Sequence, residues 1–467
     1  MSAAAITLCE AARAMQAEYR GPDAAFATVG TDTRTIVSGE LFFALRGERF
    51  DGADFVPDAL AKGAVAAVVA RGSGERLDRV PRERLMWVDD VRLALGRLGA
   101  YRRGRYENPL LALTGSNGKT TVKEMTAAIL AVAAGGAERV LATAGNLNND
   151  IGVPLTLLRL APEHRYAVVE MGMNHAGEIR YLSTLAHPDV ALVNNAGTAH
   201  LENLGSREAI ARAKGEIFAG LAPGGTAVIN ADDRFAPMWR KAAGARRQIA
   251  FALDRPADVR GRATLRRDAS MLALDIPGGH GTVEVAVAGE HNARNAVAAA
   301  AAAVALDVGI DAIVCGLATY RGVKGRLQPK AGAAGARLID DTYNANPDSV
   351  AAAISVLAAA PGRRLLILGD MGELGPNASA LHAEVGDFAK AAGIDALFAL
   401  GELSVHAVTA FGAGARHCSS LEELIDAIRP ELGPHVTVLV KGSRFMQMER
   451  VVAALAAPAA PEHRTES

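Results

Sequence analysis

The sequence has few aromatic residues, few cysteines and almost no net charge, and each shortage excludes a class of protein. Aromatic residues make up 4% of the chain and are not interleaved with a basic stretch, which argues against a nucleic-acid-binding surface. The three cysteines, Cys9, Cys315 and Cys418, are far apart, which excludes a simple disulfide framework and a cysteine-spaced metal site. The formal net charge is −1, so a polyanion is not the expected partner.

Long apolar runs are also missing. No run approaches the roughly 20 residues that a membrane-spanning helix needs. The first residues, MSAAAITLCEAARAMQ, do not place a basic segment before a long apolar one, as a secretion signal would. We therefore expect a cytoplasmic monomer that binds small molecules, with no nucleic-acid partner and no membrane insertion.

The chain is long and apolar enough for several cores. It has 467 residues, half of them hydrophobic, and about 150 residues per domain suggests roughly three domains. Short apolar runs that end in polar residues, such as RYAVVEMG, PDVALVNNAG and GGTAVINADD, alternate with helical patterns. This alternation predicts α/β domains with parallel sheets flanked by helices, and ligands at the carboxyl ends of the strands. We place the domains at residues 1–107, 108–327 and 328–467.

The stretch LALTGSNGKTTVKEM predicts a phosphate-binding loop. A short buried strand from Leu110 is followed by glycines, and then by a helix in which Val122, Met125, Ile129 and Val132 recur at helical spacing. Backbone N–H groups at such a turn and the helix dipole attract an anion. The alternative is an ordinary glycine turn before a core helix, and the longer phosphate-loop pattern has a glycine where Leu113 stands.

Other polar residues are candidates for chemistry, each with a simpler explanation. Glu170 ends a predicted strand, where it would either bind Mg²⁺ or be a solvated carboxylate. His200 follows another strand and is either a metal ligand or a hydrogen-bonded structural residue. Lys214 has the pattern of a solvated helix lysine. Arg326 either contacts a phosphoryl group or lies on the surface.

Two asparagines, Asn292 and Asn295, lie three residues apart and therefore on one helical face. Their amides would read a base or orient phosphate, and capping by Asn292 is the alternative. The alanine-rich run that follows them predicts a largely buried helix.

Taken together, the motifs TGSNGKTT, NLNNDIGVP, VVEMGMN, NAGTAHLENLGS, AKGEIF, GEHNARNA, GRLQP, DDTYNANPDS, GDMGELG and VLVKGSR resemble the Mur ligase family, in the same order and over nearly the whole chain. The short phosphate loop is the family's own form, so Leu113 is no longer an objection. The resemblance implies an amino-terminal UDP-binding domain, a central phosphate-loop ATPase domain with a parallel sheet, and a carboxyl-terminal Rossmann-like domain. Within the family, YNANPDS, GDMGELG and KGSRFMQME resemble the member that adds D-alanyl-D-alanine.

The resemblance also implies residue roles. Positions that match the ATP site are Gly115, Ser116, Asn117, Gly118, Lys119, Thr120, Thr121, Asn292, Asn295, Arg326 and Asp341. Positions that match metal ligands are Thr120, Glu170, His200 and Lys214, the last as a carbamate, and the catalytic set is Lys119, Lys214, His200 and Arg326. Positions that match substrate-binding segments are Thr33, Arg34, Gly47, Asp51, Asn148, Asn149, Tyr343, Asn344 and Asn346. Asn346 precedes Pro347, so shaping that turn is its alternative role.

The implied activity is ATP-driven ligation of D-alanyl-D-alanine to UDP-N-acetylmuramoyl-tripeptide, in peptidoglycan precursor synthesis. ATP and Mg²⁺ would be required, and the tripeptide carboxylate would become an acyl phosphate before the dipeptide amine attacks it. We expect the carboxyl-terminal domain to close over the central one at a hinge in GVKGRLQP.

Three rival functions remain: a sibling ligase that adds a diamino acid, a folate polyglutamylating synthase, and a nucleotide-binding switch that ligates nothing. The DDTYNANPDS segment argues against the first, because a DNPR-like motif is expected there.

Overall fold

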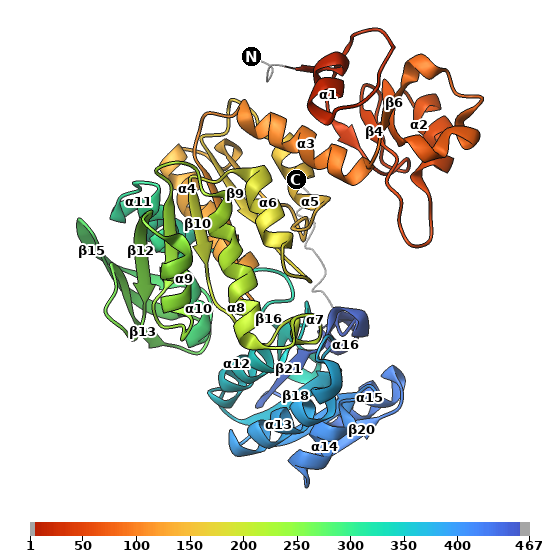
Figure 1. Cartoon of the computed structure of the whole chain (residues 1–467). Helices are drawn as coiled ribbons and strands as arrows, with labels where there is room; N and C mark the ends of the chain where they lie inside the picture. The colour runs from red at the N-terminus through yellow and green to blue at the C-terminus, as the bar shows by residue number, and fades with distance from the viewer. Residues whose placement is uncertain (1–4, 458–467) are drawn as a thin grey trace, which may run out of the picture.

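The computed structural model describes residues 5–457, which form three α/β parts (Figure 1). The amino-terminal part, red to orange in Figure 1, and the blue carboxyl-terminal part contact the central part at different places. The α/β class with parallel sheets is confirmed. Within residues 5–457, no helix is both long enough and apolar enough to cross a membrane.

The amino-terminal part is built on a four-stranded parallel sheet. The strands, in spatial order, are β3 (Val29–Gly30), β4 (Leu41–Phe43), β5 (Ala66–Ala70) and β6 (Leu85–Val88). Its helices are α1 (Leu8–Met15), α2 (Val56–Ala61) and α3 (Val91–Gly104), and β1 (Ile6–Thr7) pairs with β2 (Ala25–Phe26). Helix α3 also packs on two helices of the central part, so it joins the two parts.

The central sheet has nine strands. Their spatial order is β15 (Gly279–Val285), β14 (Ser270–Ile276), β13 (Val259–Leu265), β12 (Arg247–Ala252), β11 (Thr226–Asn230), β10 (Val190–Val193), β7 (Leu110–Thr114), β9 (Tyr166–Glu170) and β8 (Val140–Ala142). The strands from β8 to β13 run parallel, but β14 and β15 are antiparallel. The predicted parallel sheet thus carries two additional antiparallel strands at this edge. Burial alternates along β14, because one face of this extension packs on helices and the other is more exposed.

Two layers of helices cover the central sheet. One layer holds α4 (Lys119–Ala134), α10 (Glu290–Ala305) and α11 (Ile310–Thr319). The other holds α5 (Gly152–Leu158), α6 (Glu178–Ala186), α8 (Arg207–Gly215) and α9 (Ala236–Ala243). The alanine-rich run lies in α10 and is buried, as predicted. Val132 is 40% exposed and not part of the core, because it lies at the edge of the buried stripe of α4, which Leu130 completes.

The carboxyl-terminal part is built on a six-stranded sheet. The spatial order is β16 (Gln328–Ala331), β17 (Arg337–Asp341), β21 (Val436–Lys441), β18 (Arg363–Gly369), β19 (Ala396–Leu400) and β20 (Ala415–Cys418), and only β16 is antiparallel. The helices are α12 (Pro347–Ala358), α13 (Ala378–Ala391), α14 (Val405–Phe411), α15 (Leu421–Ile428) and α16 (Glu449–Leu455). Because β21 is inserted between β17 and β18, the loops after these three strands lie side by side.

Candidate active site

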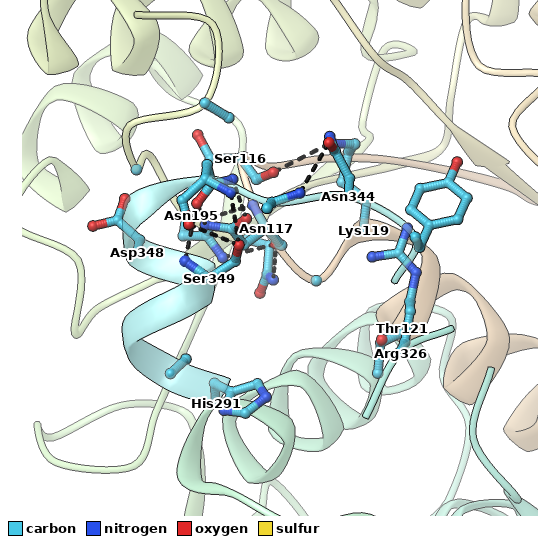
Figure 2. A pocket seen from close by; sticks show the side chains of 18 of the residues that line it. Ser116, Asn117, Lys119, Thr121, Asn195, His291, Arg326, Asn344, Asp348 and Ser349 are labelled. Atoms are coloured by element: carbon cyan, nitrogen blue, oxygen red, sulfur yellow. Dashed lines mark hydrogen bonds between the residues drawn. The ribbon is translucent and has the colours of Figure 1, made fainter. Parts of the chain in front are cut away.

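Residues at the carboxyl ends of strands from two sheets line one cleft, and Figure 2 shows some of the side chains that line it. The cavity has a volume of about 1060 Å³. Residues that follow or end β7, β9, β10 and β11 line it from the central part, and residues that end or follow β17, β18 and β21 line it from the carboxyl-terminal part. Strand ends of this kind are where α/β folds bind ligands.

The predicted phosphate loop, residues 115–118, lies in this cleft between β7 and α4. Gly118 has φ 79°, and a Cβ at this position would collide with the side chains of Asn194 and Asn295. Asn195 holds the loop open, because its Oδ1 accepts the Asn117 N–H at 2.9 Å and its backbone oxygen accepts the Ser116 N–H at 3.1 Å. The Ser116 hydroxyl is buried with no hydrogen-bond partner in the described chain. An unpaired donor in a glycine turn at a helix start suits a phosphate.

The amide pair Asn194 and Asn195 was missed in the sequence, although a signal exists. Both follow the apolar strand β10, which pairs with β7. The Asn194 amide donates to the Asn117 oxygen at 3.0 Å and to Asn295 Oδ1 at 2.9 Å. Asparagines that follow the strand next to β7 are therefore a sequence signal for side chains that hold the phosphate loop in place.

Lys119 begins helix α4 with its ammonium group folded onto the phosphate loop. Its Nζ donates to the oxygen of Gly115 at 2.8 Å. Burial lowers the pKa of Lys119, and the nearby Glu170 carboxylate opposes this shift. An amine stabilised only by carbonyl oxygens can turn to a phosphate that enters the cleft.

Glu170, Thr120 and Arg326 form one chain of hydrogen bonds. The Arg326 guanidinium donates to Thr120 Oγ1 at 3.0 Å, and the Thr120 hydroxyl donates to Glu170 Oε2 at 3.0 Å. Asn148 donates to Glu170 Oε1 at 2.8 Å. Glu170 is 2% exposed, so it is not a solvated carboxylate at a strand end, and Arg326, which also stacks over Tyr343, is not a free surface arginine.

The fit to Mg²⁺ can be tested on these residues. Glu170 is a buried carboxylate without an ion-pair partner among residues 5–457, and the Thr120 hydroxyl touches it. No group of three or more His, Cys, Asp and Glu side chains in this range could hold a metal by itself. Mg²⁺ bound by one or two side chains with phosphate oxygens and water needs no such group. The residues therefore fit a magnesium ion that binds together with a phosphate.

His200 contacts a residue that the sequence did not suggest. Its Nδ1 lies 2.6 Å from Glu373 Oε2, a contact between the central and carboxyl-terminal parts. The contact with His200 lowers the pKa of Glu373, although burial opposes this. His200 and Glu373 both have positive φ, 64° and 61°, so local backbone strain accompanies this contact.

Lys214 is not the solvated helix lysine that its sequence pattern suggests. It is 1% exposed on α8, and in the part of the chain that the structure describes it has neither a hydrogen-bond nor an ion-pair partner. Burial, helped by the charge of Lys119, lowers the pKa of Lys214 well below its ordinary value. Burial therefore favours the neutral form of this amine.

Asn292, Asn295 and Asp341 also line the cleft, and each is fixed by hydrogen bonds. Gly289, not Asn292, is the N-cap of α10, and the Asn292 amide donates to the Ala288 oxygen at 2.9 Å. Asn295 Nδ2 lies 3.3 Å from Asn292 Oδ1. Asp341 accepts from Lys441 Nζ at 2.6 Å.

Three further contacts join the carboxyl-terminal part to the central part. The side-chain amides of Asn346 and Asn117 form two hydrogen bonds with each other, at 2.8 and 3.4 Å. Asn346 is also the N-cap of α12, which fits its alternative role in shaping the turn before this helix. Asp348 Oδ2 accepts both the backbone N–H and the hydroxyl of Thr198, at 2.6 and 2.9 Å. Figure 2 shows Asp348 and Ser349 on the first turn of α12, close to Asn117 and Asn195. The Glu202 N–H donates to the Glu373 oxygen at 3.1 Å.

The cavity brings together most, but not all, of the predicted site residues. Those that line it are Ser116, Asn117, Gly118, Lys119, Thr121, Asn148, Glu170, His200, Asn292, Asn295, Arg326, Asp341, Tyr343, Asn344 and Asn346. Those that do not are Gly115, Thr120, Asn149, Lys214, Thr33, Arg34, Gly47 and Asp51. The last four belong to the amino-terminal part, and Asn149 Oδ1 accepts the Gly152 N–H at 2.9 Å at the start of α5.

The loop and the sheets around it define a phosphate-loop nucleotide-binding protein. Three family models match the chain: the Mur ligase family catalytic domain at residues 25–103, the Mur ligase middle domain at 113–303, and the Mur ligase glutamate ligase domain at 325–444. The chain belongs to the Mur ligase family.

Specific relatives cover nearly the whole chain. UDP-N-acetylmuramoyl-tripeptide–D-alanyl-D-alanine ligase of Escherichia coli is 44% identical over 96% of this chain and 98% of its own. A crystal structure of MurF from Acinetobacter baumannii is 38% identical and superposes with a TM-score of 0.89, covering 97% of this chain and 99% of that one. MurF from Thermotoga maritima in complex with ADP is 27% identical, with a TM-score of 0.81 and coverage of 91% and 96%.

Proposed function

We infer that the protein is an ATP-dependent ligase that joins D-alanyl-D-alanine to UDP-N-acetylmuramoyl-tripeptide and forms ADP and phosphate. The observation that carries this is the cleft, in which a phosphate loop faces a second α/β sheet, in a chain 44% identical to an enzyme of that name. The reaction belongs to peptidoglycan precursor synthesis, and hence to cell wall biogenesis, cell shape and cell division. We propose that it acts in the cytoplasm, where UDP-linked precursors and ATP would be its substrates.

We propose a division of labour among the three parts. Residues 1–107 bind the UDP group, residues 108–327 bind ATP, and residues 328–467 bind the incoming dipeptide. In the first part, Thr33, Arg34, Gly47 and Asp51 follow β3 and β4, at the carboxyl end of their sheet. Asn148 and Asn149 would meet the sugar pyrophosphate, and Tyr343, Asn344 and Asn346 lie where the adenosine and dipeptide sites adjoin. One chain provides all of these groups, so we propose that it acts as a monomer.

The proposed reaction has two displacement steps. The terminal carboxylate of the tripeptide attacks the γ-phosphorus of ATP, and the bond to ADP breaks. The amine of the dipeptide then attacks the carbonyl carbon of the acyl phosphate, loses a proton, and expels inorganic phosphate. Anions approach one another in the first step, so the positive charges of Lys119 and Arg326 would neutralise the repulsion.

Magnesium and a modified lysine would complete the charge balance. Thr120 and Glu170 would hold Mg²⁺ against the phosphates, where the ion supplies positive charge to the transferring group. We propose that Lys214 carries a carbamate, because carbon dioxide adds only to a neutral amine and burial of this side chain favours its neutral form. His200 would contribute to a second metal position shared with the tripeptide substrate.

The contacts of α12 predict that Asp348 holds the two parts together. Asp348→Ala removes two hydrogen bonds to Thr198, one of them at 2.6 Å, and charged hydrogen bonds contribute about 1.5–3 kcal/mol each. We expect a larger radius of gyration in X-ray scattering and about tenfold lower kcat/KM. The control is Asp387→Ala, which alters an exposed residue of α13. A variant with unchanged scattering and activity would show that these bonds do not hold the central and carboxyl-terminal parts together.

The function itself is tested by phosphate release. The protein would receive ATP, Mg²⁺ and UDP-N-acetylmuramoyl-tripeptide, with D-alanyl-D-alanine, meso-diaminopimelate, L-lysine or glutamate as acceptor. We expect release to rise at least about tenfold with the dipeptide alone, together with a product whose mass corresponds to the joined peptide. Release that ignores the acceptor would indicate a nucleotide-binding switch, and release with another acceptor would indicate a sibling ligase.

A further inference from the structure

If the proposed function is correct, the cleft must also bind the carboxylate end of the acceptor peptide, D-alanyl-D-alanine. D-Alanyl-D-alanine has a reacting amine at one end, two methyl groups, and a free carboxylate at the other end. A carboxylate that enters a cleft loses water and needs a cation or several donors in exchange. The candidates are the cationic side chains that line the cleft.

Three of these cations already have a proposed role or a carboxylate partner. Lys119 and Arg326 lie at the phosphate loop and at Thr120. Arg294, at the far end of the cleft, forms ion pairs with Asp232, Asp254 and Glu290. None of these three cations is available to a peptide carboxylate.

Three others have partners of different kinds. Arg207 and Arg234 lie near the partly buried carboxylate of Asp233 without an ion pair to it; Arg207 donates to the Ala196 oxygen at 3.5 Å, and Arg234 stacks over the Phe235 ring. Lys441 is buried and donates to Asp341 at 2.6 Å and to the Asn344 oxygen at 2.9 Å. Moving Lys441 would leave a buried carboxylate without its partner, which is costly.

Unlike Arg207 and Arg234, which lie on the central part, Arg444 lies on the carboxyl-terminal part, which receives the acceptor peptide in the proposed function. Its side chain is 68% exposed, it lines the cleft, and its one charged partner among the described residues is Glu449 at 3.2 Å, which is itself 40% exposed. An exposed pair of this kind contributes little to stability. A substrate carboxylate can therefore replace Glu449 at small cost.

The loop that carries Arg444 is fixed at the centre of the binding edge. Ser443 Oγ accepts the Gly372 N–H at 2.7 Å and donates to the Ala345 oxygen at 3.2 Å. The Ser443 N–H donates to the Asp370 oxygen at 2.9 Å. These bonds tie the loop after β21 to the loops after β17 and β18, both of which line the cleft. Arg444 thus extends from an ordered position.

Phe445 supplies an apolar surface beside the guanidinium. It is 65% exposed, among the most exposed of the large apolar side chains in the described chain, and it lines the same cleft. A Cβ at position 372 would come within 3.0 Å of its ring, so Gly372 allows the ring to lie close to the loop after β18. A ring in this place can cover the methyl groups of a small peptide.

We propose that Arg444 and Phe445 form the subsite for the carboxylate end of the acceptor peptide. The guanidinium binds the terminal carboxylate through two parallel N–H donors, and the ring packs on the alanyl methyl groups. The free amine of the same peptide then points toward the phosphate end of the cleft.

The test pairs a change in the enzyme with a change in the substrate. kcat/KM is measured for D-alanyl-D-alanine and for D-alanyl-D-alaninamide, which lacks the terminal charge, with the unmodified protein, Arg444→Ala, Arg444→Lys and Arg450→Ala. Arg450 is an exposed arginine of α16 that does not line the cleft, so it is the matched control. Phe445→Ala tests the apolar contact, and thermal melting checks that each variant is folded.

We expect the unmodified protein to prefer the dipeptide over its amide by about 10- to 100-fold. Arg444→Ala should lose this preference by slowing the dipeptide alone, with KM for ATP unchanged, and Arg444→Lys should keep part of it. Phe445→Ala should raise KM for both acceptors, and Arg450→Ala should change nothing. A preference that survives in Arg444→Ala would overturn the proposal. An unmodified protein that uses neither acceptor would instead refute the proposed function, and the subsite with it.

Discussion

Lys119→Ala is expected to lower kcat for phosphate release by about a thousandfold or more. The ammonium group lies inside the phosphate loop, 2.8 Å from the Gly115 oxygen, and is the lysine nearest to where a γ-phosphate would bind. Charge develops on the transferring phosphoryl group, and a preorganised cation there typically contributes 10²- to 10³-fold or more. The measurement is steady-state release with saturating ATP, tripeptide substrate and dipeptide.

Stability and a second lysine separate this effect from misfolding. Burial already lowers the pKa of Lys119, so the amine is not a source of folding energy, and the alanine variant should melt near the temperature of the unmodified protein. Lys241→Ala, at an exposed position of α9, should retain full activity. A folded Lys119→Ala protein with more than about a tenth of the original kcat would contradict the role of this lysine.

The sequence was most informative where one short segment determines the structure. The strand that begins at Leu110, the glycine turn and the helix from Lys119 depend on local pattern and turn chemistry, and all three were predicted. Val132 lies in this helix as its spacing predicts, although its side chain is 40% exposed, because spacing alone does not show how far round a helix the buried face extends. The antiparallel strands β14 and β15 were not predicted. Burial alternates along them, whereas the continuous apolar runs on which the prediction of parallel strands was based are buried on both faces.

The sequence was least informative about contacts between the parts. His200 and Glu373 meet only because the carboxyl-terminal part packs on the central part, and neither residue carries a local sign of the other. Asp348 and Thr198 meet for the same reason. The burial of Lys214 also depends on tertiary packing, since its segment on α8 reads as an ordinary amphipathic helix. Roles that depend on one segment can thus be predicted from residues, while roles that depend on a partner need the fold.

Lys214→Met is expected to lower kcat by about 100- to 1000-fold without loss of stability. Methionine keeps the straight apolar chain and the volume but cannot form a carbamate, and it avoids the cavity that alanine would leave. A buried amine with no partner among the described residues costs desolvation energy, so the variant should unfold at the same or a higher denaturant concentration. The measurements are kcat over a range of Mg²⁺ concentrations and the free energy of unfolding.

The pH dependence of stability gives an independent readout in buffer free of carbon dioxide. The pKa of Lys214 in the folded protein lies below its value of about 10.4 in the unfolded chain. Between the two values the unfolded chain binds more protons, so stability rises with pH through this window and levels off above the unfolded pKa. The methionine variant lacks this contribution, and the difference between the two proteins should therefore shrink as the pH rises.

Bicarbonate distinguishes a modified lysine from a merely buried one. With ¹³C-labelled bicarbonate, the unmodified protein should show a carbamate carbon signal in NMR that Lys214→Met lacks. Adding bicarbonate should raise the activity of protein prepared without carbon dioxide, but it should not rescue the methionine variant, because methionine has no amine to modify. An active Lys214→Met protein would refute the carbamate. An inactive variant without a ¹³C signal in the unmodified protein would leave Lys214 acting as an amine, through the position it occupies beside Lys119.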